Sequence, residues 1–137
     1  MKKEDKELLL KDLCARLPYG VKCYNIFSKE ICELAAIELD RESTLFCFWD
    51  KRKMFYHQQT YLSEFKPYLF PLSSMTEEQR KELNDTLINL NLKALSDEIS
   101  LEVIATYEVD FYNKNHFDYR GLIPKDLAID ATGLNIY

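Results

Sequence analysis

Glycine is scarce in this chain: only three of its 137 residues are glycine, and no two of them lie close together. A phosphate-cradling loop and a nucleotide-binding fingerprint both need clustered glycines, so neither motif is present. The sequence also lacks a G-x-S-x-G elbow and an H-E-x-x-H motif. The conventional signatures of nucleotide-binding proteins, serine hydrolases and zinc peptidases are therefore excluded.

Histidine is scarcer still, and the cysteines are not paired. His57 and His116 are 59 residues apart, which excludes a local histidine-rich metal site. The four cysteines have no C-x-x-C spacing, and each lies in an apolar or aromatic stretch: Cys14, Cys23, Cys32 and Cys47. We expect four reduced thiols in or near the core, with no metal and no cofactor. The alternative is a zinc site whose ligands come from four separate places in the chain.

The chain has no long hydrophobic run. Its first residues are of mixed charge and lead only into Leu8-Leu9-Leu10, so neither a signal peptide nor a membrane span of about 18 apolar residues is predicted. We expect a cytoplasmic protein without membrane contact. A net charge of −5 also disfavours broad, sequence-independent DNA binding, which needs a basic surface.

What the chain does have is hydrophobic and aromatic content. Hydrophobic residues make up 47% of the sequence, and nine Tyr and eight Phe raise the aromatic share to 13%. This composition indicates a packed protein that contains a sheet, and it argues against disorder. The length predicts a single domain over residues 1–137.

The N-terminal half is expected to be a helix followed by a meander. Apolar residues at three–four spacing predict a helix over residues 5–17, with one face inward (Leu10, Leu13, Cys14, Leu17) and the other outward (Lys6, Glu7, Lys11, Asp12, Arg16). On this assignment Cys14 is buried rather than a nucleophile. Strand-like runs at 21–27, 31–39, 44–49 and 54–59 are separated by short polar turns, which predicts an antiparallel sheet of three or four strands.

The C-terminal half mixes helix and strand signals, giving an α+β fold overall. Residues 61–75 are expected to be irregular because of their prolines, and Thr76 and Gln79 form a capping-box pattern for a helix that fades near residues 89–91. Alternation over residues 99–107 suggests a strand, with a helix over residues 97–107 as the rival. Asp110 is expected to cap a short helix to His116, and residues 127–129 to pack the tail onto the core.

The densest recognition chemistry lies in residues 111–123. If the segment is extended, His116, Asp118 and Arg120 point to one side, where they could serve a hydrolase or nuclease as base, orienting carboxylate and phosphate-binding group. The alternative is structural: Asp118 turns the backbone after a helix, Arg120 pairs with it, and the neighbouring aromatics fill the core.

A second candidate site lies at residues 51–57. Lys51, Arg52 and Lys53 are followed by aromatics including Tyr56, as in a hairpin tip that contacts phosphates while a ring stacks on a base. The alternative is a charged turn that keeps a sheet edge soluble.

Three segments, residues 12–22, 66–78 and 116–128, resemble a family of small proteins of unassigned activity from Bacteroidetes and their phages and prophages. The matches cover about a quarter of the chain and occur in the same order. This chain has Phe70 where the family tends to have a basic residue, and Asp126 where it tends to have Gly. The resemblance implies a phage or mobile-element setting, in which small acidic proteins often bind a host protein and sometimes block a defence system. It implies no catalytic residues.

Taken together, these patterns favour a non-enzymatic protein-binding accessory module. Its expected contact residues are Tyr112, Tyr119 and Arg120, residue types that are common at interfaces, and its partner is a protein of unknown identity. The rival hypotheses are the hydrolase or nuclease at residues 116–120 and nucleic-acid binding through residues 51–57.

Overall fold

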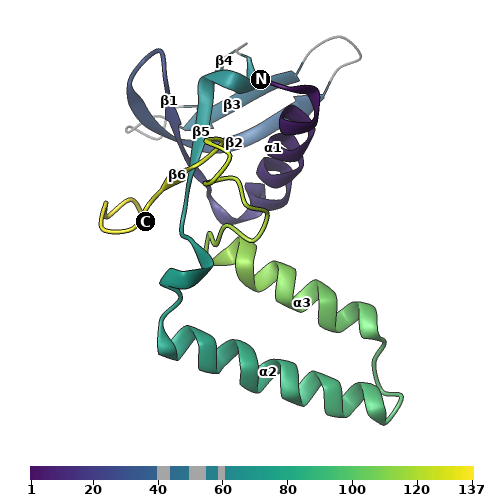
Figure 1. Ribbon diagram of the computed structural model, residues 1–137. Coiled ribbons are helices and arrows are strands. Elements are labelled where there is room, and N and C mark those ends of the chain that lie inside the picture. The colour runs from purple at the N-terminus through teal and green to yellow at the C-terminus, as the bar shows by residue number, and fades with distance from the viewer. Residues whose placement is uncertain (40–43, 50–54, 59–60) are drawn as a thin grey trace.

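The structure is a computed structural model in which residues 1–39, 44–49, 55–58 and 61–137 are described (Figure 1). It shows the expected α+β fold. In chain order, with η for a 3-10 helix, the elements are α1 (Lys3–Arg16), η1 (Leu17–Tyr19), β1 (Lys22–Asn25), β2 (Glu30–Leu39), β3 (Thr44–Trp49), β4 (Phe55–Gln58), η2 (Leu62–Glu64), β5 (Phe65–Leu69), η3 (Leu72–Ser74), α2 (Glu77–Leu95), α3 (Leu101–Lys114) and β6 (Ile129–Asp130).

The strands of the described residues form one sheet in the order β4-β3-β2-β1-β5-β6. The predicted meander is confirmed: β1 to β4 pair antiparallel with their sequence neighbours, and the register shifts between Leu34 and Ala36. The sheet is larger than expected, because β5 pairs antiparallel with β1, and β6 pairs parallel with β5.

The expectation that residues 61–75 are irregular is wrong, since β5 lies inside this range. Its Pro67 is opposite Cys23 of β1. The amide of Ile26 donates to the carbonyl of Glu64, and hydrogen-bonded pairs alternate along an antiparallel ladder. Pro67 therefore occupies a non-bonded position towards β1, where its missing N–H costs no bond to that strand.

Helix α1 lies against the sheet, and its buried face differs from the predicted one (Figure 1). Leu13 is buried as predicted, but Leu10 and Leu17 are only partly buried. Leu9, Asp12 and Arg16, which were not placed on the inward face, are buried instead. Cys14, predicted to be buried, is exposed. The assignment was wrong because it placed every charged residue outside, whereas Asp12 and Arg16 neutralise each other in the interior.

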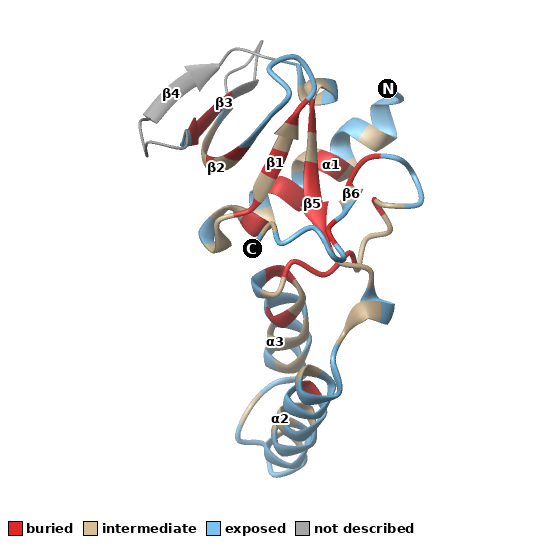
Figure 2. Ribbon diagram, turned by 90° about the vertical axis from the view of Figure 1, so that its left-hand side faces the viewer, coloured by how far each residue is buried: buried red, intermediate tan, exposed pale blue. Residues whose placement is uncertain are grey.

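The main core lies between α1, the sheet and the C-terminal loop. Its aromatic centre is Phe48 and Phe65, whose ring centroids are 4.5 Å apart, with Phe46 beside them. Leu122 and Leu127 add apolar side chains from the C-terminal segment, so the predicted packing of the tail onto the core is confirmed. Figure 2 shows that buried residues concentrate in this part of the molecule.

Helix α2 begins as predicted. The Thr76 hydroxyl accepts from the backbone amide of Gln79 at 3.2 Å, and the Gln79 side chain accepts from the amide of Thr76 at 3.0 Å. Such a cap stabilises a helix by about 1 kcal/mol. The helix does not fade near residues 89–91 but continues to Leu95, because the helix formers Leu92, Lys93 and Ala94 extend it.

The strand suggested for residues 99–107 is wrong. The rival helix over residues 97–107 is correct in type, although it begins only at Leu101. Helix α3 begins after Ser100 and packs on α2, so no neighbouring strand pairs with this segment. Asp110, expected to cap a short helix, lies inside α3. The alternation of apolar residues predicted a strand with one buried face. In the structure Leu101 and Val103 are exposed, so the alternation does not mark a buried face.

The two helices form a hairpin that projects away from the sheet (Figure 1). A second, smaller core joins its base to the rest of the chain through Leu83, Phe111 and Phe117, with Phe70 and Tyr107 packed against them. Most of the hairpin beyond this base is exposed or only partly buried (Figure 2). None of the helices in the described residues is long and apolar enough to span a membrane.

Candidate functional site

The segment after α3 is a turn rather than the extended run that the catalytic hypothesis assumed. His116 adopts a left-handed conformation with φ of 58°, and Phe117 forms an isolated bridge with Phe70. The amide of Phe70 donates to the carbonyl of His116 at 2.9 Å, and the amide of Asp118 donates to the carbonyl of Phe70 at 2.7 Å. These bonds fasten the end of α3 to the segment that follows β5.

Asp118 organises the loop that follows it. Its two carboxylate oxygens accept from the amides of Leu122 and Ile123, both at 2.8 Å. The structural alternative, in which Asp118 turns the backbone after a helix, is confirmed in this respect. The carboxylate is therefore committed to the backbone and does not orient His116.

Arg120 pairs with Asp12 of α1 rather than with Asp118. Its Nε lies 3.3 Å from the Asp12 Oδ1. Asp12 also holds Arg16, whose Nε donates to Oδ2 at 2.7 Å and whose Nη2 donates to Oδ1 at 3.1 Å. The Nη2 of Arg16 also donates a hydrogen bond of 2.7 Å to the carbonyl of Phe117. One buried carboxylate thus joins two guanidinium groups where α1 meets the C-terminal loop.

This buried network was missed in the sequence. The available signal was the four-residue spacing of Asp12 and Arg16 in the same helical rows as Leu9 and Leu13. That spacing is also typical of exposed ion pairs, so it does not by itself predict burial. The carbonyl of Phe117, which completes the network, lies 101 residues from Arg16 in the sequence.

Tyr119 is surrounded by the same cations. Its ring lies 4.7 Å from the guanidinium of Arg120, 5.6 Å from that of Arg16, and stacks on Tyr112 at 5.5 Å. The Tyr112 hydroxyl donates to Glu108 at 2.9 Å, and burial together with this bond raises the pKa of Tyr112 to about 12. Tyr112, Tyr119 and Arg120 are all partly buried in the junction, so their expected role as contact residues stays a prediction.

His116 is buried and stacks on Tyr137, with ring centroids 3.8 Å apart and an angle of 11° between the planes. Burial, together with the positive charges of Arg16 and Lys22, lowers the pKa of His116 to about 4. The ring is therefore neutral at pH 7. Its Nδ1 has no hydrogen-bond partner among the described residues. The structure does not bring His116, Asp118 and Arg120 together as a base, an orienting carboxylate and a substrate-binding cation.

The second candidate site falls largely outside the described residues. Lys51, Arg52 and Lys53 belong to a range that the structure does not describe, and Tyr56 lies in β4, where only the backbone is described. Nucleic-acid binding through this segment stays a prediction.

The cysteines form no disulfide within the described part of the chain. Cys23, Cys32 and Cys47 are buried as expected, and burial raises the pKa of the Cys23 thiol well above its usual value. Among the described residues, no group of three or more histidine, cysteine and acidic side chains is placed to hold a metal ion.

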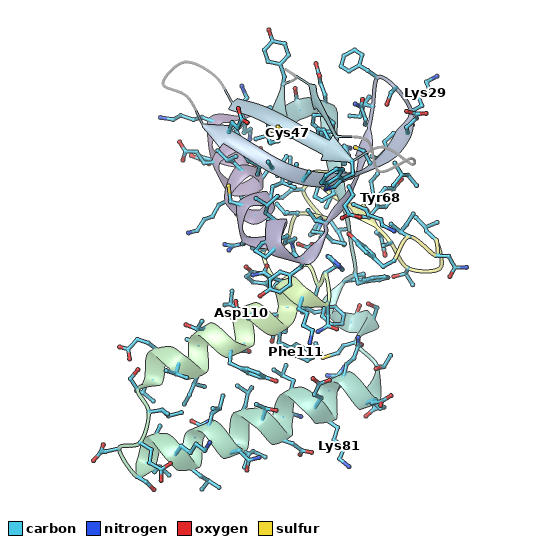
Figure 3. The ribbon with its side chains drawn as sticks, turned by 180° about the vertical axis from the view of Figure 1, so that it is seen from behind. Lys29, Cys47, Tyr68, Lys81, Asp110 and Phe111 are labelled. Atoms are coloured by element: carbon cyan, nitrogen blue, oxygen red, sulfur yellow. The ribbon has the colours of Figure 1, made fainter. Side chains whose placement is uncertain are left out.

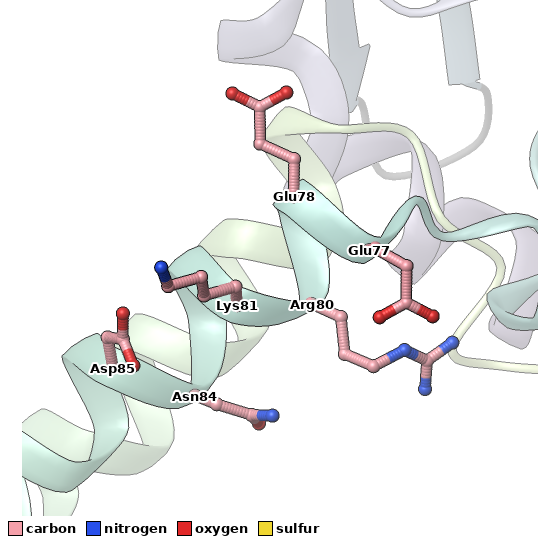
Figure 4. Close-up of a pocket in the computed structure, with 6 residues that line it drawn as sticks. All are labelled: Glu77, Glu78, Arg80, Lys81, Asn84 and Asp85. Carbon is pink, nitrogen blue, oxygen red and sulfur yellow. The ribbon is translucent and has the colours of Figure 1, made fainter.

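A surface depression follows the first turns of α2 (Figure 4). It is lined by side chains of this one helix, namely Glu77, Glu78, Arg80, Lys81, Asn84 and Asp85. The depression is open to solvent, and its lining side chains carry charges of both signs.

The comparisons with known proteins supply no identity. Neither the protein-family models, nor the curated proteins, nor the solved structures contain a match to this chain. The resemblance based on residues 12–22, 66–78 and 116–128 therefore stays a prediction.

Proposed function

We propose that this chain is a non-enzymatic protein-binding module that presents its α2–α3 hairpin to a protein partner. The phage or mobile-element setting belongs to the same proposal and rests on the three sequence segments alone. The single observation that supports binding is a row of exposed apolar side chains on α2: Ile88, Leu92 and Leu95.

The spacing of this row places it on one face of the helix. Ile88, Leu92 and Leu95 follow each other at intervals of four and three residues, which is the pattern of a helix face that packs on another element. Their exposed fractions are 59%, 58% and 83%. The inward row next to it, which includes Leu83 and Leu87, already packs at the base of the hairpin.

The far end of the hairpin adds to this surface. Leu101, at the start of α3, is 71% exposed, and Val103 is exposed as well. Scattered exposed apolar residues are ordinary, but a continuous helical row together with the hairpin end is typical of an interaction surface. Two helices can cover only one face of each other, so this apolar row is left open to another molecule. Figure 3 shows the side chains around both helices of the hairpin, which stands clear of the sheet.

The test is capture of a partner from cells of the native host with a Leu92→Gln/Leu95→Gln variant. The matched control is Phe27→Gln/Tyr61→Gln, which removes two apolar side chains that are 70% and 78% exposed elsewhere on the surface. We expect a protein that the wild type and the control enrich and the hairpin variant loses, while circular dichroism shows all three chains folded. Equal recovery with both variants would refute the assignment of the hairpin.

A further inference from the structure

The hairpin carries the net charge of the whole protein. Residues 77–114 contain nine Asp and Glu against four Lys and Arg, a balance of −5, and the chain total is also −5. The rest of the chain contains 14 residues of each sign. The negative potential is therefore concentrated on the element that also exposes the apolar row.

Among the described residues, no cation forms an ion pair with a carboxylate of the hairpin. The ion pairs among the described residues are Lys3–Glu7, Arg16–Asp12, Lys66–Asp126, Arg120–Asp12 and Lys125–Asp5, and none involves a hairpin residue. Outside the hairpin, Asp5, Glu7, Asp12 and Asp126 form ion pairs. Of the hairpin carboxylates, Glu108 accepts from the Tyr112 hydroxyl, whereas the tip carboxylates Asp97, Glu98 and Glu102 are in no ion pair among the described residues and face solvent.

At the hairpin end, charge and apolar surface coincide. We call residues 92–103 the hairpin tip. Its exposed apolar side chains are Leu92, Leu95, Leu101 and Val103, and its charged residues are Asp97, Glu98, Glu102 and Lys93. Three of the four charges are negative. An apolar centre with an acidic rim is complementary to an apolar face flanked by Lys and Arg.

We infer that the occupant of this surface is a basic amphipathic helix of a partner protein, which lies along the hairpin as a third helix. This inference rests on the proposed function and specifies its partner class. The four–three spacing of Ile88, Leu92 and Leu95 matches the row that an α-helix presents to another helix. A second copy of this chain is a poorer fit, because it would bring two hairpins of charge −5 together.

The experiment uses two fluorescein-labelled peptides that share one helical apolar face of leucines. One carries Lys and Arg on its other face, and the second carries Glu at the same positions. Fluorescence anisotropy with the full chain should show saturable binding of the cationic peptide only. Raising the salt concentration from about 50 to about 300 mM should weaken that binding about tenfold, because the rim contacts are exposed to solvent.

Two sets of variants separate specific recognition from general attraction to an acidic protein. Asp97→Asn/Glu98→Gln/Glu102→Gln removes three charges at the tip and should weaken binding of the cationic peptide about tenfold. The control, Glu4→Gln/Glu30→Gln/Glu38→Gln, removes three exposed charges elsewhere and should leave the affinity nearly unchanged. Equal weakening by both sets, or equal binding of both peptides, would overturn the inference.

The outcomes distinguish the inference from the proposed function. If host-partner capture depends on Leu92 and Leu95 but not on the three tip carboxylates, and neither peptide binds, then the function stands and the basic helix is refuted. If capture does not depend on Leu92 and Leu95, the function itself fails. Sedimentation velocity of the chain alone should show a monomer. A dimer that is lost in Leu92→Gln/Leu95→Gln would assign the surface to a second copy and overturn the basic partner.

Discussion

The Nη2 of Arg16 donates a 2.7 Å hydrogen bond to the carbonyl of Phe117, which lies 101 residues further along the chain, and both side chains are fully or almost fully buried. Asp12 neutralises the guanidinium from the preceding helical turn. The bond joins the end of α1 to the turn after α3, where the base of the hairpin meets the rest of the fold. The orientation of the hairpin thus depends on a contact between distant parts of the chain.

Replacing Arg16 should destabilise the fold strongly. Arg16→Ala leaves Asp12 buried with only the partly aligned Arg120, and removing one partner of a buried pair costs about 3–5 kcal/mol. Urea unfolding measures the change. The matched control is Lys3→Ala, which breaks an exposed pair with Glu7 at the same four-residue spacing and should have a much smaller effect. Equal losses in the two variants would show that burial of the pair is unimportant.

His116 should make the fold less stable as the pH falls. The pKa of His116 is lowered from 6.5 to about 4 in the folded chain, so between these values the unfolded chain binds a proton that the folded chain does not. The contribution of the neutral ring is therefore complete above pH 6.5 and is lost progressively down to about pH 4.

The variant His116→Gln isolates this contribution. His57 and all the carboxylates are common to both proteins, so the difference in unfolding free energy between wild type and variant should shrink as the pH is lowered from 7 to 4. A difference that stays constant over this range would mean that His116 titrates normally.

Position 126 should favour glycine over alanine. Asp126 has φ of 58°, the left-handed conformation in which a side chain is strained. Asp126→Gly and Asp126→Ala both remove the ion pair with Lys66, so their difference reports the backbone alone. We expect Asp126→Gly to be more stable by about 1 kcal/mol in thermal or urea unfolding. Equal stability would contradict the assigned conformation.

Cys14 should be the one readily labelled thiol of the described chain. It is exposed on α1, whereas Cys23, Cys32 and Cys47 are buried. Under native conditions Ellman's reagent should modify about one equivalent per chain, slowly near pH 7 because partial burial raises the pKa of the Cys14 thiol. Cys14→Ser should abolish the modification of this one equivalent. Labelling of several thiols in the folded Cys14→Ser variant would contradict the prediction, because it would show that the buried cysteines become accessible.

Several features of the fold could be predicted from the sequence because their causes are local. The capping box at Thr76 and Gln79 is a contact within one turn, and the short connections of residues 21–58 leave antiparallel hairpins as the simplest pairing. Burial of Phe46 and Phe48 likewise follows from a nearly continuous apolar run.

Other features were decided by the tertiary structure. Residues 65–69 became a strand because β1 offers them an edge, and residues 101–114 became a helix because α2, not a strand, lies beside them. The sequence pattern places Asp12 and Arg16 on the surface. In the folded chain both are buried, and Arg16 donates to the carbonyl of Phe117, which is distant in sequence. The sequence by itself determined the local caps, turns and apolar runs. Only the folded chain decided which charges are buried and which apolar rows remain uncovered, because both depend on neighbours that are distant in sequence.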